Sequence, residues 1–228
     1  MSSERDEKSF NQRIPSKDAH MKPSAVEPAS LSRSQRRRRD DIIQAALKIF
    51  DRDGFDAARM ADIASEAEVA KGTLYLYFDT KFALLEGVIS SAVIPSLQQV
   101  SDTLDTYQGS ARDLLAEQIR IIARRQASPE MKMLIRIILS APEQHRSVIE
   151  FFHQNVIKEG LTLVQKTLRL GVESGEFKEE VANMDPIIFV GAHAYLAVWS
   201  NLFEDESALD VTALIDNYMG AVFNGIIR

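Results

Sequence analysis

The stretch MADIASEAEVAKGTLYLYFDTK, residues 60–81, decides the fold of this chain. Four apolar residues of its first half recur at the spacing of one helical stripe, namely Met60, Ile63, Ala64 and Ala67. Val69 follows where a tight turn is expected, and a second short helix is predicted from about Lys71. In that helix Leu74 and Phe78 lie one turn apart and form the buried face. The stretch therefore predicts two short helices joined by a tight turn.

The second helix has the division of side chains that a DNA-recognition helix needs. Its small and hydrogen-bonding residues are expected to face outward, namely Lys71, Gly72, Thr73, Tyr75 and Tyr77. Gly72 and Thr73 allow the helix N-terminus to approach the major groove closely. The first backbone amides of the helix, Lys71 and the tyrosine hydroxyls suit phosphate oxygens. The two helices are therefore predicted to form a helix-turn-helix that reads DNA.

The same residues resemble the signature of the TetR family of bacterial transcriptional regulators. The resemblance covers residues 62–64, 69–78 and 80–81, and further upstream 45–50 and 54–55, in the same order and spacing. The rest of the chain is similar to the family only in length and helical texture. The resemblance implies a dimeric repressor that a small, often hydrophobic molecule releases from DNA.

The formal net charge of −6 for the whole chain would disfavour binding to nucleic acid, but the charge is unevenly distributed along the chain. Residues 1–81 contain 15 Lys and Arg against 14 Asp and Glu, whereas residues 82–228 contain 12 against 19. The arginines of the first segment gather at Arg33 and at residues 36–39, at the start of the first predicted helix. Local basic patches set the affinity for phosphate, so we expect these arginines to contact DNA. The alternative is that they form only a solvated face.

Four positions depart from the family signature. Arg59 stands where the family has a capping Ser or Thr, and arginine cannot cap a helix although it can bind phosphate. Glu68 occupies a turn position that is commonly Gly, where a positive φ strains any other residue. Ala70 replaces a second capping residue, and Ala83 replaces the acidic residue that completes a capping box. The predicted DNA-binding residues are Arg37, Arg38, Arg39, Arg59, Ala70, Lys71, Gly72, Thr73, Tyr75, Tyr77 and Lys81.

The chain before this element divides into a tail and a supporting helix. Residues 1–32 are rich in Ser, Lys, Glu, Asp and Pro without apolar periodicity, and a disordered tail is predicted there. They lack the apolar run of a secretion signal, so a cytoplasmic protein is expected. The first helix is predicted from about residue 37 to residue 53, with Asp40 and Asp41 in its first turn. Gly54 is expected to end it in a left-handed conformation, with the next residue folding back onto it.

Beyond Lys81 only helical patterns are found, and they predict an all-α fold. A connecting helix is expected at 80–106 with a kink or break at Pro95, followed by helices at about 110–127, 130–140 and 142–174, the last ended by Gly175. We therefore predict an N-terminal three-helix helix-turn-helix domain at residues 33–81. A C-terminal helical bundle for ligand binding and dimerisation is predicted at residues 82–228.

The last two predicted helices are unusually apolar. Residues 187–203 contain no charged side chain. Their 17 positions are at the short limit for a membrane span, so no membrane partner is expected. A helix that is apolar on nearly every side is instead expected to be buried on more than one side. The final helix carries a continuous apolar seam from Val211 to Ile226. Packing on the chain's own core is one interpretation, and a four-helix dimer interface is the favoured one. The predicted interface residues are Leu214, Tyr218, Met219, Val222 and Phe223.

Candidate effector-binding residues are aromatic, Met or His positions with a polar tip, namely Tyr107, Met133, Phe152, His153, His193, Tyr195 and Trp199. Each of them is individually more typical of core packing. The chain has no cysteine, its four histidines lack ligand spacing, and neither a Gly-rich phosphate loop nor a Gly-x-Ser-x-Gly motif is found. We therefore expect no metal, no cofactor and no enzyme activity.

Two functions remain open from the sequence. The favoured one is a repressor that binds a palindromic operator in double-stranded DNA as a homodimer and responds to a small-molecule effector. Two half-sites are then expected roughly 34–36 Å apart, one turn of the DNA. The alternative is a DNA-binding protein of the same fold whose output is the control of a protein partner. An exposed apolar patch outside the dimer seam favours that alternative.

Overall fold

The computed structural model describes residues 31–140, 146–203 and 210–227, and within them the regular elements are helical. In chain order they are α1 (Arg33–Ala57), α2 (Met60–Glu66), α3 (Lys71–Tyr77), α4 (Lys81–Thr106), α5 (Ala111–Gln126), α6 (Pro129–Ser140), α7 (Arg146–Phe152), the π-helical turn η3 (His153–Ile157), α8 (Lys158–Glu173), the 3₁₀ turn η4 (Glu179–Asn183), α9 (Ile187–Leu202) and α10 (Val211–Ile226). The predicted all-α fold is confirmed.

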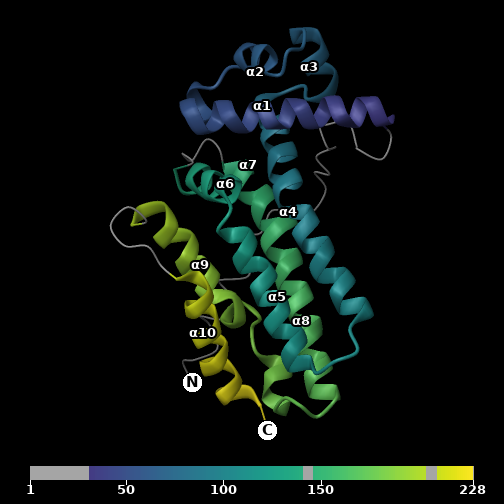
Figure 1. Ribbon diagram of the computed structural model, residues 1–228, viewed down its shortest axis with the longest axis vertical. Coiled ribbons are helices and arrows are strands. Elements are labelled where there is room, and N and C mark those ends of the chain that lie inside the picture. Colours follow the sequence, from purple (N-terminus) through teal and green to yellow (C-terminus); the bar gives the residue numbers. More distant parts are fainter. Residues whose placement is uncertain (1–30, 141–145, 204–209, 228) are drawn as a thin grey trace, which may run out of the picture.

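Helices α1 to α3 form one end of the molecule. Figure 1 shows α1 lying across that end, with α2 and α3 on its outer side and α4 running from it into the helical domain. The predicted helices of the helix-turn-helix are confirmed, with Leu74 and Phe78 fully buried beneath α3. The outer face of α3 therefore points away from the rest of the chain.

Helix α1 begins earlier than residue 37, because Ser32 caps it. The Ser32 hydroxyl accepts a hydrogen bond from the backbone N–H of Gln35 at 3.3 Å, and the Gln35 side chain accepts one from the Ser32 N–H at 2.9 Å. This is a capping box. Asp40 and Asp41 consequently lie beyond the first turn, so the predicted contact with the helix dipole is wrong.

The tail predicted over residues 1–32 is shorter at its C-terminal side. Leu31 is buried and Ser32 belongs to the α1 cap, so the folded part of the chain includes both. Residues 1–30, where the prediction of disorder falls, lie outside the described residues.

The predicted positive φ at Gly54 is confirmed, although α1 resumes beyond it to Ala57. Gly54 has φ 77° and ψ 162°, a conformation that interrupts α1 and that glycine adopts without steric penalty. Phe55 then folds back, and its ring packs edge-on against Phe50 with centroids 5.4 Å apart. An aromatic contact therefore stabilises the interruption at Gly54.

The departures from the family signature have the predicted structural consequences. Glu68 adopts φ 53° in the turn between α2 and α3. Arg59 and Ala70 stand at the N-caps of α2 and α3 without a side-chain hydrogen bond to either helix. Thr80 caps α4 by accepting from the backbone N–H of Ala83 at 2.9 Å. The helix-turn-helix is thus formed without two of its usual caps.

Helices α1 to α3 are called the reading head below. One apolar core extends from the reading head into the helical domain that begins with α4. It contains Ile43 and Phe50 of α1 together with Leu85 of α4 and Leu134 of α6. Helix α1 packs on α2, α4 and α6. A second core joins α5, α8, α9 and α10. Helices α4 and α6 therefore connect α1 to the helical domain.

Two expected interruptions in the helical domain differ from the structure. Helix α4 continues through Pro95, so of the predicted kink or break the break is absent from this helix. The helix predicted at 142–174 instead contains a π-helical turn, η3, between α7 and α8. Its predicted end is confirmed, since Gly175 adopts φ 78° there.

The apolar helix α9 is covered on several sides and exposed on one. Phe189, His193 and Leu196 are buried, but several large apolar residues are exposed, namely Ile187, Ile188, Tyr195, Val198 and Leu202. Helix α9 packs against α5, α6, α8 and α10, so the expected cover on more than one side is confirmed, and one outer face is left exposed. Among the described helices α4 is the one long and apolar enough to cross a membrane, and 50% of that apolar window is buried inside the protein.

Candidate nucleic-acid interface and effector cavity

The outward face of α3 carries most of the predicted DNA-reading residues. Lys71, Gly72 and Tyr75 are exposed, and Thr73 is half-buried beside them. The Lys71 ammonium lies over the Tyr75 ring, 5.9 Å from its centroid. This contact places a positive charge and a hydroxyl at the N-terminal half of the helix, where the free backbone amides also point outward. The surface therefore combines groups suited to phosphate with small residues suited to base edges.

Two further residues complete the description of this face. Tyr77 is half-buried and packs against the core, so it is less available than predicted. Leu76 has 73% of its surface exposed, although no DNA role is predicted for it from the sequence. An exposed leucine beside a base edge can contact a thymine methyl group. The sequence does contain a sign of this exposure, because Leu76 is apolar but does not lie on the helical face that Leu74 and Phe78 form.

The predicted arginines are divided between surface and interior. Arg37 and Arg38 are exposed on α1, and Arg59 is exposed at the start of α2. Arg39 is only 8% exposed and its guanidinium stacks on Phe78, 5.1 Å from the ring centroid. Burial lowers its pKa from the ordinary value. The prediction that Arg39 contacts DNA is therefore wrong, because its side chain lies on the inner face of α1.

Lys81 is also turned toward the protein. Its ammonium donates to the backbone carbonyls of Phe55, Asp56 and Ala58 at 2.6, 2.9 and 3.0 Å. The ammonium also lies over the Phe55 ring, with Nζ 4.7 Å from the ring centroid. An ammonium has three N–H donors, and all three are engaged. This geometry assigns Lys81 to the support of the loop between α1 and α2, in place of the predicted phosphate contact.

A cavity of about 370 Å³ lies in the helical domain, within the range of small-molecule sites. Residues of α4, α5, α6, η3, α8 and α9 line it, together with Phe152 at the end of α7. Its wall is almost entirely apolar. Two of its lining residues, Phe152 and His193, are predicted from the sequence. Two others, Arg125 and Gln126, are not, because they stand at the end of an amphipathic helix and belong to no distinguishing motif.

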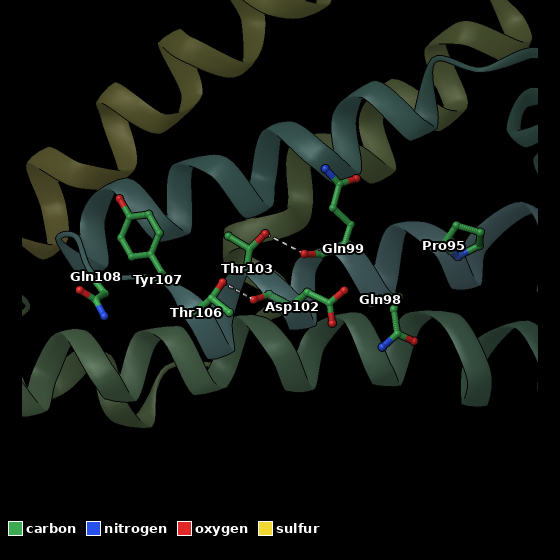
Figure 2. Close-up of a pocket in the computed structure, with 8 residues that line it drawn as sticks. All are labelled: Pro95, Gln98, Gln99, Asp102, Thr103, Thr106, Tyr107 and Gln108. Carbon is green, nitrogen blue, oxygen red and sulfur yellow. Dashed lines mark hydrogen bonds between the residues drawn. The ribbon is translucent and has the colours of Figure 1, made fainter.

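The other predicted effector residues lie elsewhere. Met133 is buried in the core beneath α1. Tyr107 lines an open polar groove at the far end of α4, which Figure 2 shows beside Gln108. His153 is exposed over a separate surface depression of α8. Tyr195 and Trp199 stack on the outer side of α9, with ring centroids 5.6 Å apart. These five predictions do not match the cavity.

His193 is a buried structural group within the cavity wall. Its Nε2 lies 3.0 Å from the Ile119 carbonyl and its Nδ1 lies 3.2 Å from the Val190 carbonyl. Burial lowers its pKa, and the two carbonyls oppose that shift. The imidazole therefore lies between α9 and α5, and in the neutral form that burial favours its single N–H donates to one of these two carbonyls. No group of three or more potential metal ligands occurs among the residues that the structure describes.

The predicted dimer seam is divided between two faces of α10. Met219 and Phe223 are buried in the chain's own core, so these two predictions are wrong. Leu214, Tyr218 and Val222 are half-buried at the edge of that core. The neighbouring outer side of α9 is the more exposed surface, with Leu202 62% exposed. Figure 1 shows α9 and α10 along one side of the helical domain.

Known proteins resemble this chain most clearly in the reading head. Residues 42–88 match the family model described as bacterial regulatory proteins, tetR family. The uncharacterized HTH-type transcriptional regulator YvdT of Bacillus subtilis (strain 168) is 32% identical over 88 residues, covering 38% of this chain and 45% of that protein. The HTH-type transcriptional repressor KstR of Mycobacterium tuberculosis (strain ATCC 25618 / H37Rv) is 41% identical over 68 residues, covering 29% of this chain and 31% of that protein. Both matches span less than half of the relative.

Other similarities extend over the helical domain. The Fatty acid metabolism regulator protein of Bacillus subtilis (strain 168) is 23% identical over 189 residues, covering 81% of this chain and 93% of that protein. The structure of FadR from Bacillus subtilis in complex with stearoyl-CoA has a TM-score of 0.66 at 22% identity, covering 82% and 98% of the two chains. The SmeT–triclosan complex has a TM-score of 0.67 at 20% identity, covering 84% and 92%. At these identities the structures establish the fold.

Proposed function

Because this chain is a transcriptional regulator with the DNA-binding domain of the bacterial TetR family, we propose that it is a repressor released from its operator by a small apolar ligand. In this proposal residues 33–81 read the DNA, and residues 82–228 bind the ligand and form the dimer. The protein acts in the cytoplasm, where bacterial DNA lies. The single observation that carries the proposal is the outward face of α3.

That face fits the requirements of major-groove reading. Leu74 and Phe78 hold the helix on the core, so its orientation is fixed from behind. Lys71, Gly72 and Tyr75 remain exposed in front. Arg37 and Arg38 on α1 and Arg59 on α2 add cationic groups on the flanks. We assign the flanking cations to phosphate and the first turn of α3 to base edges.

A dimer is proposed because one short helix offers few base contacts. A bidentate side-chain contact to one base is worth roughly 1–3 kcal/mol of discrimination, so two symmetric heads double the specificity of one. The exposed apolar face of α9, which includes Tyr195 and Leu202, supports this proposal. A surface of that kind, next to the half-buried residues of α10, is typical of a two-fold interface.

Ligand release is proposed from the position of the cavity. Val93 of α4 and Ile135 of α6 line it, and both helices pack on α1. A ligand that prefers one arrangement of α4 and α6 therefore changes the orientation of the reading heads. The names of similar proteins support an apolar ligand, since one is a fatty acid metabolism regulator and two are described with stearoyl-CoA and triclosan. KstR is named a repressor.

A selection of genomic fragments with the purified protein at physiological salt tests this function. We expect enrichment of one palindromic site, and a Tyr75→Ala variant that binds both the site and random duplex more weakly because a phosphate contact is lost. Tyr107→Ala, at the far end of α4, is the matched control and is expected to bind as the native chain does. Enrichment spread over many unrelated fragments contradicts a local repressor and favours a global regulator or the control of a protein partner.

A further inference from the structure

The cavity wall contains one cationic side chain among the described residues. The polar residues that line it are Ser96, Arg125, Gln126 and His193. Both ring nitrogens of His193 already face backbone carbonyls. Arg125 and Gln126 are therefore the polar pair left for a ligand, side by side at the C-terminal end of α5.

Arg125 has an unused hydrogen-bond donor. Its Nε is buried and has no hydrogen-bond partner among the described residues. Its Nη1 lies 3.7 Å from Oε2 of Glu130, a separation longer than a hydrogen bond, so that ion pair is loose. A guanidinium N–H left without an acceptor in an apolar cavity is unfavourable, and an acceptor brought by a ligand removes the penalty.

We propose that the effector is an elongated apolar molecule with a single carboxylate, which the Arg125 guanidinium binds inside this cavity. This inference rests on the proposed ligand-released function. The planar fork of arginine matches the two oxygens of a carboxylate, and Nε is one arm of that fork. The adjacent Gln126 amide supplies a further donor. No second cation lines the cavity in the part of the chain that the structure describes, so one anionic group is matched and a dianion is not.

The rest of the cavity defines the body of the ligand. Apart from the polar residues named above, its lining is apolar. Large apolar residues also reach the surface at its margin, namely Leu139, Ile157, Ile187 and Val198. An alkyl or fused-ring body can therefore follow an apolar path from the interior to the surface. A volume of about 370 Å³ suits a molecule of small-ligand size.

Calorimetric titration of the full chain with dodecanoate, dodecanol and dodecylamine tests the assignment, with each probe below its aggregation concentration. We expect dodecanoate to bind about tenfold to a hundredfold more tightly than dodecanol, since one charge-assisted hydrogen-bonded pair separates them. Dodecylamine is expected to bind more weakly still, because its charge has the wrong sign. Equal affinity for the acid and the alcohol overturns the proposal.

Variants of two adjacent arginines locate the contact. Arg125→Met keeps an unbranched apolar stem without the guanidinium and is expected to abolish the preference for dodecanoate over dodecanol. Arg124→Met is the matched control, because Arg124 pairs with Glu117 at the exposed surface and does not line the cavity. The control is expected to keep the preference. An unchanged preference in Arg125→Met, or an equal loss in Arg124→Met, removes Arg125 from the site.

Release of the protein from its selected operator separates this inference from the repressor proposal. If dodecanol releases the DNA as well as dodecanoate does, a ligand-released repressor survives and the carboxylate assignment is overturned. If dodecanoate binds with the expected dependence on Arg125 but leaves the DNA complex intact, the binding site is supported and the release mechanism is wrong. If no probe binds to protein that binds its operator, the inference fails.

Discussion

Single residues in the turn between α2 and α3 set the local stability of the reading head. Glu68 adopts φ 53°, a conformation that costs roughly 1–2 kcal/mol for a residue with a Cβ. Ala70 leaves the first amides of α3 without a side-chain partner. The element is therefore held by burial of Leu74 and Phe78 more than by its local sequence. This balance is characteristic of short helices, whose stability comes mainly from packing.

Replacement of Glu68 by Gly is expected to stabilise the protein. Glycine removes the steric penalty at positive φ, and its greater freedom in the unfolded chain offsets part of the gain, which leaves about 0.5–1 kcal/mol. Urea unfolding followed by circular dichroism measures the difference. Glu66→Gly is the control, because Glu66 lies inside α2 and pairs with Lys48, so this variant is expected to be less stable. Destabilisation by both variants contradicts a strained turn.

Two lysines of the reading head are expected to have separable roles. Lys81→Met leaves three carbonyls without their donor, and we expect a loss of about 1–2 kcal/mol in the free energy of unfolding with little change in the salt dependence of DNA binding. Lys71→Met is the matched variant on the exposed face. It is expected to reduce the salt slope by about one while stability changes by less than about 0.5 kcal/mol.

Denaturant unfolding and DNA titrations over a range of salt concentrations give both quantities for each variant. If Lys81→Met lowers the salt slope by about one and leaves stability unchanged, Lys81 returns to the DNA interface. Arg38 and Arg39 illustrate the same distinction, since Arg38 is exposed and Arg39, the next residue of α1, is buried.

At the scale of elements, the joint between α3 and α4 depends on a close approach. A Cβ built on Gly87 of α4 would lie 2.6 Å from Cε1 of Phe78 and 3.1 Å from its Cζ. Arg39 stacks on the same ring. Phe78 is fully buried, so it has no free space into which to move. The angle between the recognition helix and α4 is therefore set by the contact of a glycine with an aromatic ring.

Gly87→Ala is expected to lower stability by about 1–3 kcal/mol and to weaken operator binding, because Phe78 has to shift the end of α3. Gly72→Ala is the control for stability, since its Cβ meets no atom within 4 Å and alanine favours the helix. Thermal unfolding and operator titration measure the two effects. Native stability and affinity in Gly87→Ala would show that this contact is not tight in solution.

The elements of the helical domain differ in how their apolar stripes are used. On α10, Met219 and Phe223 fill the chain's own core. On α9 the residues divide among a buried face with Phe189, a face toward the cavity with Ala194, and an outer face with Tyr195. The π-helical turn η3 lies in the cavity wall, and turns of this kind are frequent at functional sites.

At the scale of the whole molecule, the outer face of α9 is expected to form the dimer. Leu202→Glu places a charge on the most exposed large apolar residue of that helix, and we expect a monomer that binds the operator much more weakly. Leu170→Glu, at an exposed leucine of α8, is the matched control and is expected to remain a dimer. Sedimentation equilibrium measures the mass of each. A dimeric Leu202→Glu variant rules out this part of the face.

The sequence by itself determined the helices, their order and the presence of a DNA-reading element. Helical periodicity depends on local spacing, so the stripe of Leu74 and Phe78 is visible without a structure. Strain at Glu68 was predictable because it follows from one backbone position.

Only the tertiary structure decided which of several equivalent residues face the solvent, the cavity or the core. Periodicity groups residues on a face but does not say what covers that face, so the burial of Met219 and the exposure of Tyr195 depend on how α5, α9 and α10 pack. In the same way, Arg125 differs from Arg124 only because one of them lines the cavity. Packing between distant helices decides which residues are buried, exposed or in the cavity wall, and the spacing of residues along one helix does not reveal that packing.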